Sequence, residues 1–111
     1  MKVSYEEIGH ISATFTADSG EAGQLCKMAG NGKVAPCTDG DVFIGIIEGV
    51  RQGCAGVQIQ GFAEVTYTGA APALGYVNLS ANGNGGVKTG SGREYLVVSV
   101  DSTAMTAIIK L

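Results

Sequence analysis

The feature that most constrains the fold is an alternation of apolar and polar residues over positions 57–68, which only Phe62 interrupts on the polar face. Successive side chains of a β-strand point to opposite faces, so a period of two places every second residue on one face. The first face holds Val57, Ile59, Gly61, Ala63, Val65 and Tyr67. The run therefore predicts a strand with one buried face, and Gly61 predicts a kink or bulge within it.

Other stretches of the chain also have the pattern of strands. The same alternation recurs over residues 11–16. Two nearly all-apolar runs, 42–47 and 95–98, predict strands that are covered on both faces. The remaining expected strands are 24–28, 33–36, 76–80 and 105–111.

Glycine supplies the turns between these strands. The chain contains 18 glycines among 111 residues, and Asn-Gly steps favour tight hairpins. The best helix candidate, 70–75, is too short for more than one turn. We therefore expect an all-β fold: a small Gly-rich β-barrel, β-tulip or sandwich with short hairpins and little or no helix. We expect an extended N-terminal arm over 1–10 and a single β-barrel domain over 11–111.

A short motif occurs twice. Residues 30–34 read GNGKV and residues 83–87 read GNGGV, 53 positions later. Nine residues after each valine lies the middle of an apolar run, at Phe43 and at Leu96. Two interpretations fit this pattern: two similar hairpins within one barrel, or an ancestral duplication.

Charge and hydropathy exclude two classes of partner. The net charge is −3, and the seven Lys and Arg residues are scattered singly, so we expect no binding to nucleic acid. No apolar run approaches the ~18 residues that span a membrane. The first 12 residues lack the apolar segment of a signal peptide, so we expect the chain to remain in the cytoplasm.

The reactive residue types form no convincing catalytic or metal-binding pattern. Cys26, Cys37 and Cys54 lack the paired spacing of zinc ligands, so we expect them to be reduced. His10 is the only histidine, and the neighbouring Gly9 makes rigid positioning difficult. Residues 39–41, DGD, favour a hairpin turn over a calcium loop. We expect no enzymatic activity and no cofactor.

Over residues 21–69 several short glycine-containing motifs follow one another in a recognisable order. An Ala-Gly step at 22–23 precedes a short strand, and a Gly-x-Val turn follows at 32–34. Next come an Ile-Gly-Ile-Ile strand at 44–47 and a second Ala-Gly step at 55–56 before VQIQG. This order resembles the small capsid decoration, or head cement, proteins of tailed phages and prophages. The chain's closing segment, 92–111, is also similar to the way in which such chains end.

The resemblance implies a structural role in the virion. Such proteins are β-barrel or β-tulip knobs, often homotrimers, that bind the outside of the head and resist the pressure of the packaged DNA. The expected partner is the major capsid protein. The expected location is the capsid surface, after assembly in the bacterial cytoplasm.

Two sets of residues are candidates for contacts with partners. An arm over 3–9, with Val3, Tyr5 and Ile8 as anchors, is suited to adding a strand to a capsid sheet, although a frayed terminus fits the same residues. Phe62, Tyr67 and Tyr76 are the candidate oligomer interface, because such interfaces place apolar or uncharged strands at their centre.

Three other functions stay open at this stage. The chain could be a phage tail or head–tail joining component. It could be a β-barrel that binds a small ligand, which requires an interior cavity. An enzyme or enzyme accessory domain would have to rely on His10, Glu48 or Glu64, and nothing in the spacing of the two glutamates places them together.

Overall fold

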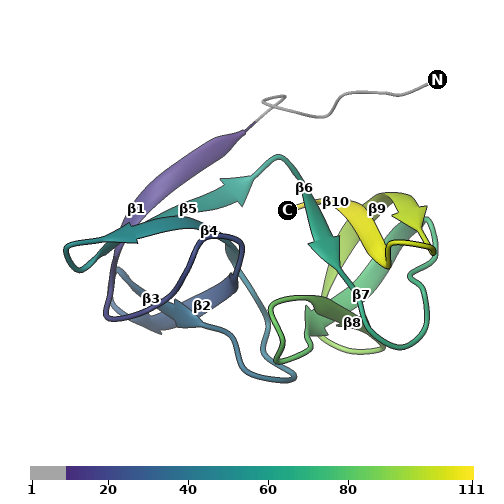
Figure 1. The fold of residues 1–111 in the computed structure, drawn as a ribbon, viewed down its shortest axis with the longest axis horizontal. Helices are drawn as coiled ribbons and strands as arrows, with labels where there is room; N and C mark the ends of the chain where they lie inside the picture. Colours follow the sequence, from purple (N-terminus) through teal and green to yellow (C-terminus); the bar gives the residue numbers. More distant parts are fainter. Residues whose placement is uncertain (1–9) are drawn as a thin grey trace.

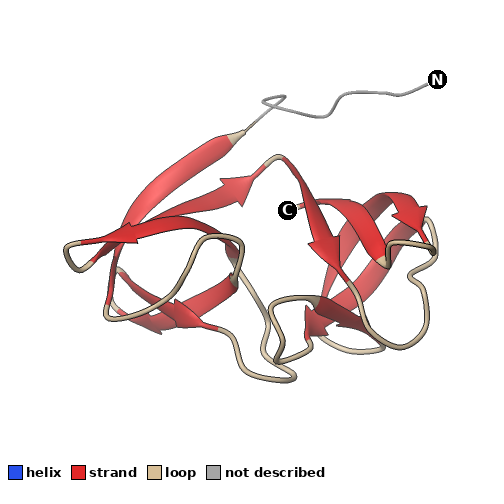
Figure 2. Cartoon of the chain, viewed as in Figure 1, coloured by secondary structure: helices blue, strands red, loops and turns tan. Residues whose placement is uncertain are grey.

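The computed structural model of the protein describes residues 10–111, and this part of the chain is all-β. It forms ten strands and contains no helix (Figure 2). The expected fold class is confirmed, and the strands make a closed barrel followed by a second five-stranded sheet. The barrel and the second sheet lie side by side along the longest axis of the molecule (Figure 1).

The first half of the chain forms the closed barrel. Its strands are β1 (Ile11–Ala17), β2 (Leu25–Gly30), β3 (Lys33–Pro36), β4 (Gly45–Arg51) and β5 (Cys54–Gln60). They follow the order β1-β3-β2-β4-β5, and the antiparallel pairing of β5 with β1 closes the ring. The pairing of β1 with β3 is parallel, whereas the other pairs are antiparallel.

The second half forms the other sheet. Its strands are β6 (Phe62–Thr66), β7 (Gly75–Ala81), β8 (Val87–Thr89), β9 (Arg93–Asp101) and β10 (Thr106–Lys110). They follow the order β6-β10-β9-β7-β8. A parallel bridge between Tyr67 and Val87 also links the chain just after β6 to β8.

The alternating run 57–68 passes from the barrel into the second sheet. Gly61 separates β5 from β6 with a φ of 107°, a conformation that side chains disfavour, so the predicted kink is confirmed. Gln58, expected on the polar face, is buried because its amide donates to the carbonyl oxygens of Gln60 (3.3 Å) and Phe62 (3.1 Å). These two hydrogen bonds hold the kink.

The other predicted strands are mostly found. Residues 33–36 are β3, and the 95–98 run lies within β9. The 42–47 prediction is wrong in its first half, because β4 starts only at Gly45. Phe43 is instead a fully buried side chain in the loop before β4. The three-residue strand β8 was not expected.

Each half has its own core, and the second core also includes residues of the barrel. The barrel interior is filled by buried Ala17, Cys26, Val34, Ile47, Ala55 and Val57. The second core is built around Leu79, Tyr95, Val97 and Ile109, and Leu25 and Phe43 pack into it from the first half. The Phe43 and Tyr95 rings stack with their centroids 4.4 Å apart. The two halves therefore share buried apolar surface.

Candidate functional site

Of the two sets of residues predicted to contact partners, the structure describes only the candidate oligomer interface. Val3, Tyr5 and Ile8 lie outside the described residues. Tyr67 is only 4% exposed and belongs to the chain's own core, because it continues the inward-facing positions of β6. It therefore offers almost no surface to a partner.

Tyr76 and Phe62, in contrast, belong to one row on the outer face of the second sheet. Tyr76 is opposite Leu96, Leu96 is opposite Lys110, and Lys110 is opposite Phe62. Tyr76 is 72% exposed, and Phe62 and Leu96 are half-buried. The row is therefore an apolar strip with Lys110 as its polar member.

Sequence reasoning missed two residues of this surface. Leu96 lies between the buried Tyr95 and Val97, so it must point outward from a strand that reads as wholly apolar. Leu74, 69% exposed, directly precedes β7. Strict alternation about Tyr95 would have found Leu96, whereas nothing in the sequence marks Leu74 as exposed.

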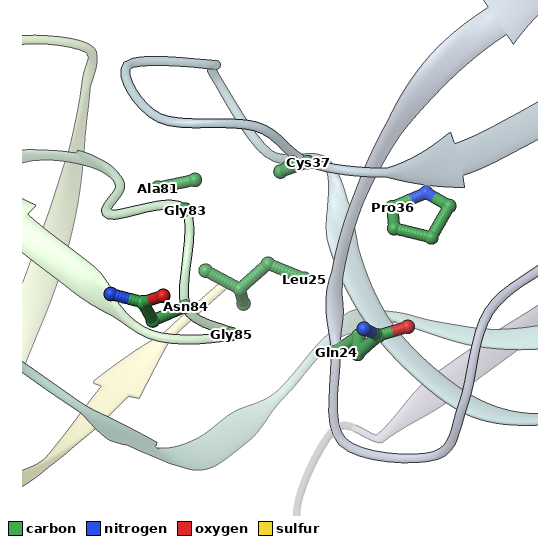
Figure 3. A pocket seen from close by; sticks show the side chains of 8 residues that line it. All are labelled: Gln24, Leu25, Pro36, Cys37, Ala81, Gly83, Asn84 and Gly85. Atoms are coloured by element: carbon green, nitrogen blue, oxygen red, sulfur yellow. The ribbon is translucent and has the colours of Figure 1, made fainter.

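A small cavity lies between the barrel and the turn after β7. Its lining is Gln24, Leu25, Pro36, Cys37, Ala81, Gly83, Asn84 and Gly85 (Figure 3). Its volume of about 210 Å³ is below the range of roughly 300–1,000 Å³ that is typical of sites for small molecules. Burial raises the pKa of the Cys37 thiol to about 12, so at neutral pH the group is a protonated thiol and a poor nucleophile. The cavity therefore gives little support to the ligand-binding alternative.

The loop between β3 and β4 connects the two halves through Asp41. The Asp41 carboxylate accepts hydrogen bonds from Lys27 Nζ (2.7 Å) and from the backbone and side chain of Thr38 (both 2.8 Å). These donors, Lys27 first, lower the pKa of Asp41 to about 2. Its backbone oxygen accepts from the Ala81 amide, and the Gly40 amide donates to the Ala81 carbonyl. The 39–41 segment is thus a turn, but the expected hairpin is wrong, because β3 and β4 do not pair with each other; the segment joins β2 to β7 instead.

A second set of polar contacts resembles a catalytic triad in composition but differs from one in geometry. His10 Nε2 lies 2.9 Å from Glu48 Oε2 and 3.0 Å from Ser12 Oγ. In a triad the serine and the acid contact different ring nitrogens, so that the imidazole can take the serine proton on one nitrogen while the acid orients the ring through the other. Here both partners share Nε2, and Glu64 lies in the other sheet. The contacts fasten the start of β1 to β4.

Among residues 10–111 no cluster of three or more His, Cys, Asp or Glu side chains is arranged to hold a metal ion. The same described range has no helix long and apolar enough to cross a membrane. Neither the models of known protein families nor the curated proteins include a match to this chain.

Proposed function

We propose that this chain is a non-enzymatic structural protein of a phage or prophage virion, which binds the outside of the capsid and stabilises the head. The proposed partner is the major capsid protein. The chain would work as a homo-oligomer, with a trimer favoured, on the surface of the virion after assembly in the bacterial cytoplasm.

The observation that carries the proposal is the resemblance of residues 21–69 to capsid decoration proteins. Two motifs of that resemblance contribute residues to the packing of the barrel. Val34 of the Gly-x-Val turn is fully buried. Gly45 of the Ile-Gly-Ile-Ile run lies so close to β5 that a Cβ there would collide with the Gln58 carbonyl oxygen. Packing within the barrel therefore explains these two motif positions, and neither indicates a reactive site.

The surface chemistry of the described residues supports a binding role rather than an enzymatic one. Lys33, Lys27 and Lys88 each lie within 2.9 Å of an aspartate carboxylate. The single histidine holds β1 against β4. The exposed apolar side chains around Tyr76 are better suited to a contact with a protein.

Co-sedimentation tests the proposal. Shells assembled from the major capsid protein encoded beside this gene are mixed with the full chain and pelleted. Saturable binding to the shells is expected. If the chain pellets with phage tails or connectors and not with shells, the decoration role is wrong and the tail or head–tail joining alternative replaces it.

The same assay tests the proposed arm. Replacing Val3, Tyr5 and Ile8 with serine is expected to weaken binding to the shells, because these are the apolar anchors of an added strand. The matched control replaces Glu6 and Glu7 with glutamine and keeps the anchors. Equal binding by both variants would keep the decoration role and would assign docking to the barrel instead of the arm.

A further inference from the structure

Three of the four asparagines in the chain directly precede a glycine: Asn31, Asn82 and Asn84. Asn31 and Asn84 are the asparagines of the repeated GNG motif, which lies in the turn after β2 and in the turn after β7. An Asn-Gly step can modify itself, because the glycine nitrogen can attack the asparagine side chain and the glycine has no Cβ to obstruct the approach. The two turns therefore contain a chemistry that the proposed function does not use.

The modification has two steps, and water is its only co-reactant. First, a bond forms between the glycine nitrogen and the asparagine Cγ, while the bond from Cγ to the side-chain nitrogen breaks. Ammonia leaves with the proton of the glycine amide, and a succinimide ring remains. Water then opens the ring at either carbonyl. One product is aspartate, and the other is isoaspartate, whose main chain runs through the side-chain carbon and is one atom longer.

Two conditions decide whether such a step reacts in a folded chain. The asparagine side chain must be able to turn toward the glycine nitrogen, and that nitrogen must not be engaged as a hydrogen-bond donor. Asparagine has donors and an acceptor on its side chain, so hydrogen bonds to its neighbours can hold it away from the glycine. The three Asn-Gly steps of this chain differ in both respects.

Asn31 and Asn84 meet both conditions. Each is exposed, as is the glycine that follows it. Within residues 10–111, these two side chains and the amides of Gly32 and Gly85 take part in no hydrogen bond. A Cβ at either glycine would have no heavy atom within 4 Å, so both steps are surrounded by open space.

Asn82, in contrast, is held in place. Its Oδ1 accepts hydrogen bonds from the backbone amides of Asn84 (2.8 Å) and Gly86 (3.1 Å). The glycine that follows it is also confined, because a Cβ at Gly83 would lie 3.2 Å from the Asp39 Cβ. The Asn82 side chain therefore cannot turn toward the Gly83 nitrogen until both hydrogen bonds break.

We propose that Asn31 and Asn84 are modification sites, at which the chain loses ammonia and becomes aspartate or isoaspartate, and that the fold protects Asn82 from the same reaction. The inference rests on the geometry of the two turns and not on capsid binding. Co-sedimentation with shells is a separate measurement, so failure of either idea would be recognised independently of the other.

At Asn31 the modification affects a contact of the barrel. The Gly32 carbonyl oxygen accepts a hydrogen bond from the Thr16 amide (2.9 Å), beside the parallel pair formed by Thr16 and Lys33. The additional main-chain atom of isoaspartate is expected to displace Gly32 from Thr16, whereas aspartate adds only a charge. Isoaspartate at position 31 should therefore loosen the pairing of β1 with β3.

Peptide mapping by mass spectrometry tests the proposed sites. The full chain is kept in mildly alkaline buffer, and each asparagine is followed by the mass gain of deamidation. Asn31 and Asn84 should react at least about tenfold faster than Asn82, because the two hydrogen bonds to the Asn82 side-chain oxygen have to break first. Asn78 is exposed but precedes a leucine in β7, so it is the internal control and should stay unmodified. Asn31→Gln should remove only the signal at its own position.

Two further measurements separate the effect of the fold from that of the sequence. In urea, all three Asn-Gly steps should react at similar rates. In the folded chain, Thr68→Ala removes the hydroxyl that accepts from Asn82 Nδ2 (3.2 Å) and should speed the reaction of Asn82, whereas Thr68→Ser keeps the hydroxyl and should not. Equal rates in the two Thr68 variants, or an Asn82 that stays slow in urea, would overturn the protection. Asn31 and Asn84 that react no faster than Asn78 would overturn the sites themselves.

Hydrogen exchange at the Thr16 amide tests the effect on the barrel. The form with isoaspartate at position 31, separated by chromatography and identified by its methylation with a protein-isoaspartate methyltransferase, should exchange faster than the unmodified chain. Asn31→Asp is the matched control, because it introduces the charge without the additional main-chain atom, and it should exchange like wild type. Equal exchange in the isoaspartate form and in wild type would show that the modification does not loosen the contact between β1 and β3.

Discussion

Gly45 and Gly49 lie on the same strand, β4, but their surroundings predict opposite tolerance to a side chain. A Cβ at Gly45 would collide with the Gln58 carbonyl oxygen and lie 2.9 Å from Val57 Cγ1, whereas a Cβ at Gly49 has no heavy atom within 4 Å. We expect Gly45→Ala to lower the free energy of unfolding by about 1–3 kcal/mol. Gly49→Ala should change it by less than about 0.5 kcal/mol. Urea unfolding measures both, and equal midpoints would contradict this account of β4.

The three cysteines are expected to differ in reactivity. Cys26 is buried in the barrel core, and burial raises the pKa of its thiol to about 11. Burial raises the pKa of Cys37 to about 12, whereas Cys54 is exposed at the start of β5. Because the thiolate is the reactive form, Ellman's reagent should label Cys54 quickly and the other two only on unfolding. The Cys54→Ser variant should lose the fast phase, and a fast phase that persists in it would refute this ranking.

At the scale of elements, the loop between β3 and β4 carries a pH-dependent contribution to stability. Its Asp41 has a pKa of about 2 against an ordinary value of 3.8. A carboxylate whose pKa is lower in the folded state stabilises the fold above 3.8 and loses that effect as the pH falls toward 2. Asp41→Asn should therefore unfold at a lower urea concentration than wild type at pH 7, and the difference should shrink as the pH falls through this range. The control is Asp18→Asn. The Asp18 carboxylate is 78% exposed, and its described contact is with the Lys33 ammonium. An equally large loss of stability at pH 7 in this variant would contradict the assignment to Asp41.

Periodicity predicted most of the strands, and its failures have physical causes. It predicted the kink at Gly61 but not that the chain there leaves one sheet for another, because both strands share the same inward phase. It extended β4 back over Phe43, which is apolar but lies in a loop. The residue is buried because it packs on Tyr95, 52 positions later, and a local pattern does not reveal such a distant contact. It missed β8, whose three residues are too few to display a period.

At the scale of the whole molecule, the exposure of a side chain depends on how the two halves pack together. Leu25 and Tyr76 lie near the starts of β2 and β7, which hold corresponding places in the strand orders of the two sheets, yet one side chain is buried and the other exposed. Local sequence contains no sign of this difference. Phe62 stands out in the sequence because it interrupts the polar face of the run 57–68, whereas Tyr67 lies on the apolar face of that run and is buried. The exposure of these side chains could therefore not be predicted from the sequence alone.

The shared core predicts that the two halves unfold as one cooperative unit. Leu25 and Phe43 of the first half pack in the second core, and the Tyr95 hydroxyl donates a 2.5 Å hydrogen bond to the Phe43 carbonyl oxygen. Separating the halves would expose all of these groups. Native-state hydrogen exchange should therefore give the same opening free energy for amides of β5 and of β9.

Tyr95→Ala sharpens this expectation, because it removes a ring that belongs to the contact between the halves. We expect it to lower the opening free energies of β5 and of β9 together, by about 3–5 kcal/mol, as for other large buried aromatic residues. Tyr76→Ser, measured under the same conditions, should lower neither by more than about 0.5 kcal/mol, because its side chain lies outside both cores. If protection in β9 falls while that in β5 is retained, the two halves are independent folding units, and the shared core does not couple their unfolding.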